Sequence, residues 1–133
     1  MLNSPLSSWV YFHFLILIFV LFSCSYKKEN PTWSEHIAPI IYKNCSPCHR
    51  SEQSGPFNLL SYSDALKKIN QIKFVVQTRY MPPWPADPGY SHFTDEKVLT
   101  QNEIDLIADW IKNGAPRGDS TKELKAPEFF SNS

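Results

Sequence analysis

Residues 45–49 read Cys-Ser-Pro-Cys-His, and this C-x-x-C-H pattern constrains the fold more than any other feature of the sequence. Two thiols three positions apart can both reach the vinyl-derived carbons on one edge of a porphyrin. The adjoining His49 is then held beneath the iron as the proximal ligand. This spacing is the attachment signature of a covalent c-type haem. Cys45, Cys48 and His49 therefore predict a fold built around one haem c.

The same five residues allow three other interpretations. A structural zinc site needs a second pair of ligands, and beyond Cys48 the sequence offers only His49 and His92 as histidines and no further cysteine. A C-x-x-C oxidoreductase belongs in a βαβ context, and the sequence has no alternating strand pattern. A structural disulfide remains conceivable in an oxidising compartment.

The first 26 residues carry no charge, although the chain has 13 Lys and Arg and 13 Asp and Glu. The stretch from Trp9 to Phe22 is apolar apart from His13, which is the length of a signal-peptide apolar region and too short to span a membrane. It runs into Leu21-Phe22-Ser23-Cys24, which resembles the bacterial lipobox. We expect a signal peptide at 1–23, lipidation of Cys24 and a tether at 24–31; an uncleaved anchor or a plain secretory signal are the alternatives.

The expected location is outside the cytoplasm, with the protein anchored to a membrane and facing the periplasm. The balanced charges give a net charge of zero, whereas a nucleic-acid-binding domain carries a basic surplus. We therefore expect no nucleic-acid partner. One cysteine for lipid and two for haem account for all three.

Hydrophobic periodicity predicts three helices and an all-α class. The first runs from an N-cap at Thr32, with Glu35 completing a capping box, to about Asn44. The second runs from residue 63 or 64 to Tyr80, with an apolar stripe of Leu66, Ile69, Ile72 and Val76, and is followed by a proline-rich stretch. The third has a capping box at Thr100–Glu103 and a left-handed cap at Asn113-Gly114.

The sixth iron position needs a second ligand. Met81 is the one methionine left after the signal peptide, and its backbone is fixed by Pro82 and Pro83. A methionine ligand raises the potential relative to two histidines. We expect Met81 as the distal ligand, with His92 or an open site as the alternatives.

Taken together, the haem motif, the Arg79-Tyr80-Met81-Pro82-Pro83-Trp84 string and the 110–116 string WIKNGAP resemble class I c-type cytochromes, in particular a bacterial monohaem cytochrome c-like domain. The resemblance covers 32–118, followed by a polar tail at 119–133. It implies a small bundle of about three helices around the haem, with Met81 as the axial ligand. Haem-crevice candidates are Trp33, Phe57, Trp84, Tyr90 and Trp110, and Arg79 and Trp84 are candidate donors to the propionates. The alternatives are that these aromatic residues belong to the ordinary core and that Arg79 is solvated.

The function expected from these features is that of a membrane-tethered monohaem cytochrome that carries single electrons between redox proteins. It has no small-molecule substrate and is not an enzyme. The alternative is a haem-based peroxidase or gas-sensing module in which the sixth ligand can be displaced.

Overall fold

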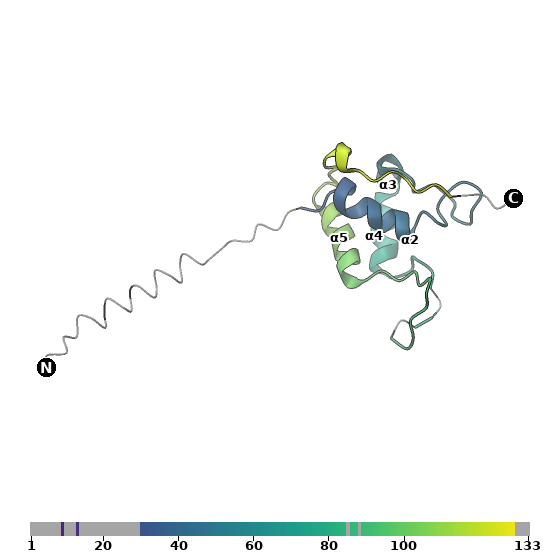
Figure 1. Cartoon of the computed structure of the whole chain (residues 1–133), viewed down its shortest axis with the longest axis horizontal. Helices are drawn as coiled ribbons and strands as arrows, with labels where there is room; N and C mark the ends of the chain where they lie inside the picture. Colours follow the sequence, from purple (N-terminus) through teal and green to yellow (C-terminus); the bar gives the residue numbers. More distant parts are fainter. Residues whose placement is uncertain (1–8, 10–12, 14–29, 85, 88, 130–133) are drawn as a thin grey trace.

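A computed structural model describes residues 9, 13, 30–84, 86–87 and 89–129. Within these residues the chain is helical and contains no strand, which confirms the all-α class for this part (Figure 1). The elements in chain order are η1 (Trp33–Ile37), α2 (Ala38–Asn44), α3 (Tyr62–Lys67), α4 (Ile69–Gln77), α5 (Gln101–Lys112) and η2 (Ser120–Lys122).

The expected signal peptide, Cys24 and the tether as far as Glu29 fall outside the described ranges, apart from Trp9 and His13. None of the helices in the described residues is long and apolar enough to cross a membrane.

The first predicted helix begins with a π-helical turn and ends at Asn44 as expected. The N–H of Ala38 donates to the carbonyl of Trp33, five residues earlier, immediately before Pro39, which has no N–H to donate. The predicted capping box at Thr32 is wrong. The Thr32 N–H donates instead to Nδ1 of His36 at 3.2 Å, and the Glu35 carboxylate accepts from the Lys122 ammonium at 2.8 Å.

The second predicted helix is divided in two and ends three residues early. Lys68 leaves the helical region (φ −118°, ψ 13°) and separates α3 from α4, and α4 ends at Gln77 rather than Tyr80. Ile72 and Val76 of the predicted stripe are buried, whereas Leu66 is 38% exposed. In α3 the buried position is Ala65 instead of Leu66.

The third helix was predicted correctly. Thr100 and Glu103 form the reciprocal capping box, and Leu99 and Ile104 on either side of it are both buried. Gly114 closes the helix with a φ of +83°.

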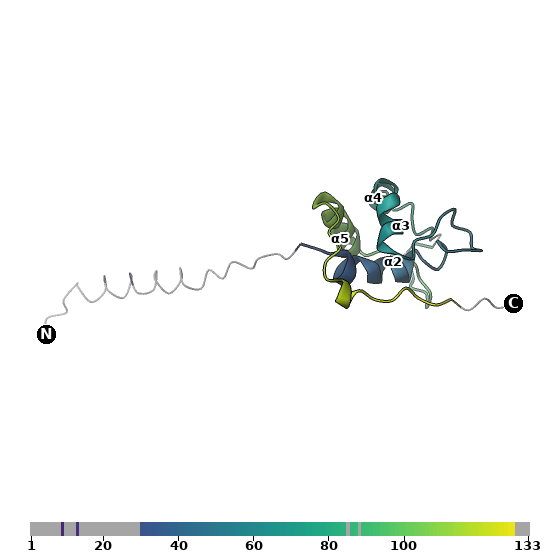
Figure 2. The same cartoon turned by 90° about the horizontal axis from the view of Figure 1, so that it is seen from above.

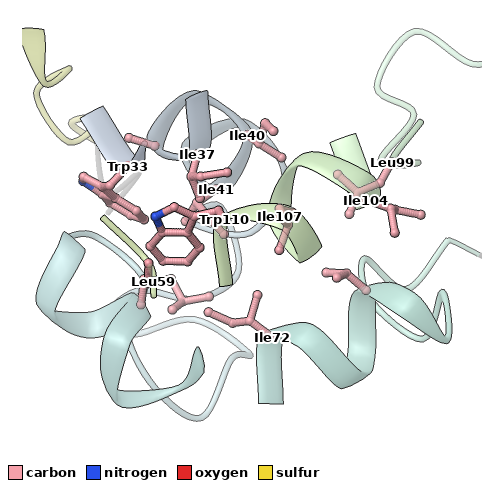
Figure 3. Close-up of a cluster of buried hydrophobic side chains, with 14 residues drawn as sticks. Trp33, Ile37, Ile40, Ile41, Leu59, Ile72, Leu99, Ile104, Ile107 and Trp110 are labelled. Atoms are coloured by element: carbon pink, nitrogen blue, oxygen red, sulfur yellow. The ribbon is translucent and has the colours of Figure 1, made fainter. Parts of the chain in front are cut away.

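The core lies where α5 packs against η1 and against α4 (Figures 1 and 3). Trp33 and Trp110 are both fully buried, with ring centroids 6.1 Å apart. Each indole nitrogen has an acceptor: Glu123 Oε1 at 2.8 Å for Trp33 and the Pro116 carbonyl at 3.0 Å for Trp110. Buried aliphatic side chains surround them: Ile37, Ile41, Leu59, Ile72, Leu99, Ile104 and Ile107.

The polar tail after Gly118 packs against the first helical segment. Glu123 accepts from both Trp33 and Arg117, the Lys122–Glu35 pair joins η2 to η1, and the Arg50 guanidinium lies 4.3 Å from the Phe129 ring centroid. The tail runs along α2 on the side opposite α4 and α5 (Figure 2). It therefore covers the outer face of the helix that leads into residues 45–49.

Candidate functional site

The C-x-x-C-H residues form one compact turn at the end of α2. The N–H groups of Cys48 and His49 both donate to the Cys45 carbonyl, at 3.1 and 2.9 Å, and the N–H groups of Cys45 and Ser46 both donate to the Ile41 carbonyl. The turn thus continues directly from the helix. These backbone hydrogen bonds hold the two cysteines and the histidine in place relative to one another.

Ser46, between the cysteines, ties this turn to the next segment of the chain. Its side chain is fully buried, and its Oγ donates to the Leu59 carbonyl and lies 3.3 Å from the Ile41 carbonyl. Ser46 was not predicted from the sequence to be a structural residue of the site. Only its position inside the motif could have drawn attention to it, because serine is usually exposed.

The imidazole of His49 is oriented by Phe57. Its Nδ1 lies 3.2 Å from the Phe57 carbonyl oxygen, and the two rings pack with centroids 4.6 Å apart. A carbonyl oxygen can only accept, so Nδ1 must carry the proton and donate it. The lone pair is then on Nε2, which is the tautomer that a metal-ligating histidine needs.

Gly55 makes this arrangement sterically possible. A Cβ built at residue 55 would lie 2.7 Å from both the Cys48 carbonyl oxygen and Nδ1 of His49. The Gly55 N–H donates to that same Cys48 carbonyl at 2.9 Å. The absent side chain therefore lets the 55–59 segment approach the histidine. No motif or periodicity in the sequence indicates this contact.

A cavity of about 440 Å³ opens in front of these groups. Its walls come from the end of α2, the motif, residues 54–59, one face of α4 and residues 81–84, with Lys97 at one edge. The lining is largely apolar, and its volume falls in the range of about 300–1,000 Å³ that is usual for cofactor sites. Six of the eleven candidates from the sequence line this one cavity: Cys45, Cys48, His49, Phe57, Met81 and Trp84.

The backbone at the end of α4 places Met81 on the wall of the cavity. Tyr80 and Arg79 donate their N–H groups to the carbonyls of Val75 and Val76, which is a Schellman cap. Arg79 occupies its left-handed position with a φ of 55°, where glycine is usual. The N–H of Met81 also donates to the Val75 carbonyl, at 3.1 Å. The chain therefore turns sharply after Gln77, which is why the helix ends earlier than predicted.

Trp84 brings a hydrogen-bond donor that has no acceptor. Its indole Nε1 is closed off from solvent and has no partner among the described residues. Its ring packs edge-on against Phe93, with centroids 6.1 Å apart. A buried donor without an acceptor costs about 1–3 kcal/mol, so this indole is placed to bind an acceptor on a ligand.

The other candidates from the sequence lie elsewhere. Trp33 and Trp110 belong to the core, and Tyr90 is 92% exposed. His92, the alternative distal ligand, is exposed and pairs with Glu96 at 2.9 Å. The Arg79 guanidinium donates to the Leu99 carbonyl at 3.2 Å and to Gln101 at 2.8 Å, and none of these five residues lines the 440 Å³ cavity.

The geometry also bears on the other interpretations of the cysteines. In the described part of the chain, no three His, Cys, Asp or Glu side chains are grouped so that they could hold a metal ion. Burial, and secondarily the neighbouring Cys48, raise the pKa of the Cys45 thiol to about 12. A redox-active C-x-x-C needs a lowered thiol pKa, so the environment of Cys45 is opposite to that of an attacking thiol.

No family model, curated protein or solved structure matches this chain.

Proposed function

We propose that this chain is a monohaem c-type cytochrome that is tethered to a membrane and carries single electrons between redox proteins outside the cytoplasm. One observation carries the proposal. Two thiols, an oriented imidazole and a thioether line one largely apolar cavity, although Met81 lies 32 residues beyond His49 in the sequence.

The residues present fit a haem. A porphyrin is a flat apolar body with two carboxylates at one edge, and the cavity offers largely apolar walls. The unpartnered Trp84 indole N–H can donate to such a carboxylate. His49 keeps its Nε2 lone pair because Nδ1 is engaged by Phe57. Cys45 and Cys48 would form the thioethers, His49 would be the proximal ligand and Met81 the distal one.

When bound, haem supplies a reversible one-electron change at iron. The chain's own residues set the conditions for that change. The Phe57 carbonyl holds the proton on Nδ1 of His49 and thereby keeps the lone pair on Nε2. The apolar lining from Ile72, Val75 and Val76 keeps water away and disfavours the more highly charged oxidised state. An electron carrier needs no general acid or base, which agrees with the proposal that this protein is not an enzyme.

One observation favours the alternative function, a peroxidase or gas-sensing module. A second cavity of about 130 Å³ shares Met81 and Trp84 with the first, so these two side chains form part of the wall between the cavities. Space behind a distal ligand would allow Met81 to move aside for a small ligand. Carbon monoxide binding to the reduced protein at equilibrium separates the two proposals, because a stable Met81 ligand resists displacement.

The central experiment uses protein matured with a periplasmic c-type haem system. We expect a pyridine-haemochrome spectrum with one haem per chain that resists acid–acetone extraction, and loss of that haem in a Cys45→Ala, Cys48→Ala double variant. The ferric protein should show the weak far-red band of iron–methionine ligation. Met81→Ala should lose this band, and the matched control His92→Ala should keep it. Wild-type protein without covalent haem contradicts the cytochrome proposal, and loss of the band in His92→Ala contradicts the Met81 assignment.

The membrane tether has its own test. Cys24→Ser should move the protein from the membrane fraction to the soluble periplasmic fraction, while its haem content stays the same. If the wild-type protein is already soluble after cell fractionation, the lipid-anchor assignment is wrong and the haem assignment is unaffected.

A further inference from the structure

Lys97 is the one Lys, Arg, Asp or Glu side chain on the lining of the 440 Å³ cavity, as far as the described residues show. It lies in the segment before α5 and is half-buried. Its ammonium group lies 3.4 Å from the Lys43 carbonyl oxygen, which is a long contact to a neutral group. No carboxylate in the described ranges lies within ion-pair distance of Lys97.

The surroundings of Lys97 differ from those of the cations that do pair. Lys122 and Arg117 reach Glu35 and Glu123 at 2.8 and 3.0 Å. The nearest acid along the chain, Glu96, is engaged with His92 at 2.9 Å. Within the described residues the Lys97 ammonium has a neutral acceptor and no counter-ion, and it lies at the edge of a largely apolar cavity, so it can pair with an anion bound there.

Another donor, which has no acceptor in the described structure, lies on the same walls. Trp84 and Lys97 both line the 440 Å³ cavity, and both also line the smaller cavity of about 130 Å³. The Trp84 Nε1 is shielded from solvent and has no partner in the described structure. An indole N–H and an ammonium both donate to oxygen anions. Their shared location indicates where a carboxylate of the cavity's ligand would bind.

We propose that Lys97 is the charged counter-ion for a carboxylate of the ligand in this cavity and that it raises the reduction potential of the protein. The inference rests on the proposed haem function, in which that carboxylate is a haem propionate. A positive charge at the cavity edge favours the reduced state, whose iron carries one positive charge fewer. Lys97 thereby acts as a positioning residue and a determinant of the potential; it is not an iron ligand.

The test compares three variants of the holoprotein by spectroelectrochemical titration at low salt. Lys97→Met removes the charge and keeps an apolar stem of similar length. Lys97→Arg keeps the charge. Lys112→Met makes the same charge change at the exposed last residue of α5, which lines neither cavity. Haem content and thermal unfolding are measured on each variant, so that loss of folding is not mistaken for loss of the charge.

We expect Lys97→Met to raise the ratio of oxidised to reduced protein at a fixed potential about tenfold, which is 59 mV for one electron. Lys97→Arg and Lys112→Met should stay within about twofold of wild type. Equal shifts in Lys97→Met and Lys112→Met, in proteins with full haem content, overturn the role of Lys97 and leave the cytochrome proposal intact. Absence of covalent haem from the wild type overturns the cytochrome proposal itself.

Discussion

Replacing Gly55 by alanine gives a direct test of the geometry around His49. The glycine backbone is not in the left-handed region, so alanine can adopt its conformation. On that ground alone, Gly55→Ala would stabilise the protein by about 0.4–1 kcal/mol through the unfolded state. The structure predicts the opposite sign, because the new methyl group would lie 2.7 Å from the Cys48 carbonyl oxygen and from Nδ1 of His49.

The size of the effect follows from these contacts. Two of the three nearest atoms to the new methyl belong to backbone, at 2.7 Å from the Cys48 oxygen and 2.9 Å from the His49 Cα, and backbone cannot move aside cheaply. Overpacking of this kind costs about 1–3 kcal/mol. Displacing the imidazole also weakens its bond to the Phe57 carbonyl, worth about 1 kcal/mol. We expect a net loss of about 2 kcal/mol, which lowers the Tm of a domain of this size by about 10 °C.

The assay is guanidinium unfolding of the holoprotein followed by far-ultraviolet circular dichroism, with the far-red ferric band recorded on the same samples. Gly89→Ala is the matched control, because a Cβ at residue 89 meets only the Asp87 carboxylate, at 3.2 Å, and that side chain can turn away. The control should stay within about 0.5 kcal/mol of wild type. If Gly55→Ala is as stable as the control and its spectrum is unchanged, the close approach to His49 is not a feature of the folded protein.

Three further predictions concern single contacts. Ser46→Ala should cost about 1–3 kcal/mol in guanidinium unfolding, because it leaves the Leu59 carbonyl without its buried donor; exposed Ser54→Ala is the control, and equal stabilities would contradict the contact. Burial, followed by the charges of two acids, raises the pKa of Tyr42 above 10.0. The neutral phenol is therefore favoured in the fold, and its contribution is retained below pH 10.0 and lost as the pH rises through the folded pKa; Tyr42→Phe should flatten the fall in unfolding free energy between about pH 9 and 11, and an unchanged slope would refute this. Arg79→Gly should be about 1 kcal/mol more stable than Arg79→Ala in thermal unfolding, because both lose the guanidinium bonds and only glycine relieves the left-handed φ of 55°; equal stabilities would show that the backbone there is not strained.

The parts of the fold that the sequence predicted well are those where the local signals agree. Three signals indicate the same boundaries for α5: the reciprocal cap of Thr100 and Glu103, the buried residues that flank this cap, and the glycine at 114. The helix in the structure has these boundaries. In the first segment, by contrast, Thr32 and Glu35 have the spacing of a capping box. Instead, the chain forms a π turn before Pro39, and Glu35 pairs with Lys122. The Thr32 N–H donates to His36. Lys122 lies 87 residues beyond Glu35, so no local pattern could have shown that competition.

At the candidate site, the chemical type of a side chain was enough to select candidates from the sequence. Where those side chains lie is determined by the backbone. Cys45, His49 and Met81 could be proposed as candidates because few residue types can attach a haem or ligate its iron. From the sequence, Arg79 is a candidate donor to a propionate. The structure instead uses its left-handed backbone to turn the chain after α4, and its guanidinium binds the segment that leads into α5.

The contacts that could not be predicted from the sequence involve backbone carbonyl oxygens, which periodicity and motif spacing do not describe. Ser46 binds a carbonyl oxygen, Gly55 makes room for one, and the Phe57 carbonyl, rather than its ring alone, selects the tautomer of His49. Each contact joins the 45–49 turn to residues 55–59, which contain no regular helix. The orientation of His49 therefore depends on a loop held by single hydrogen bonds and one close approach. This dependence is why a substitution of Gly55, which carries no functional group, is expected to affect the histidine more than most other substitutions in the cavity wall.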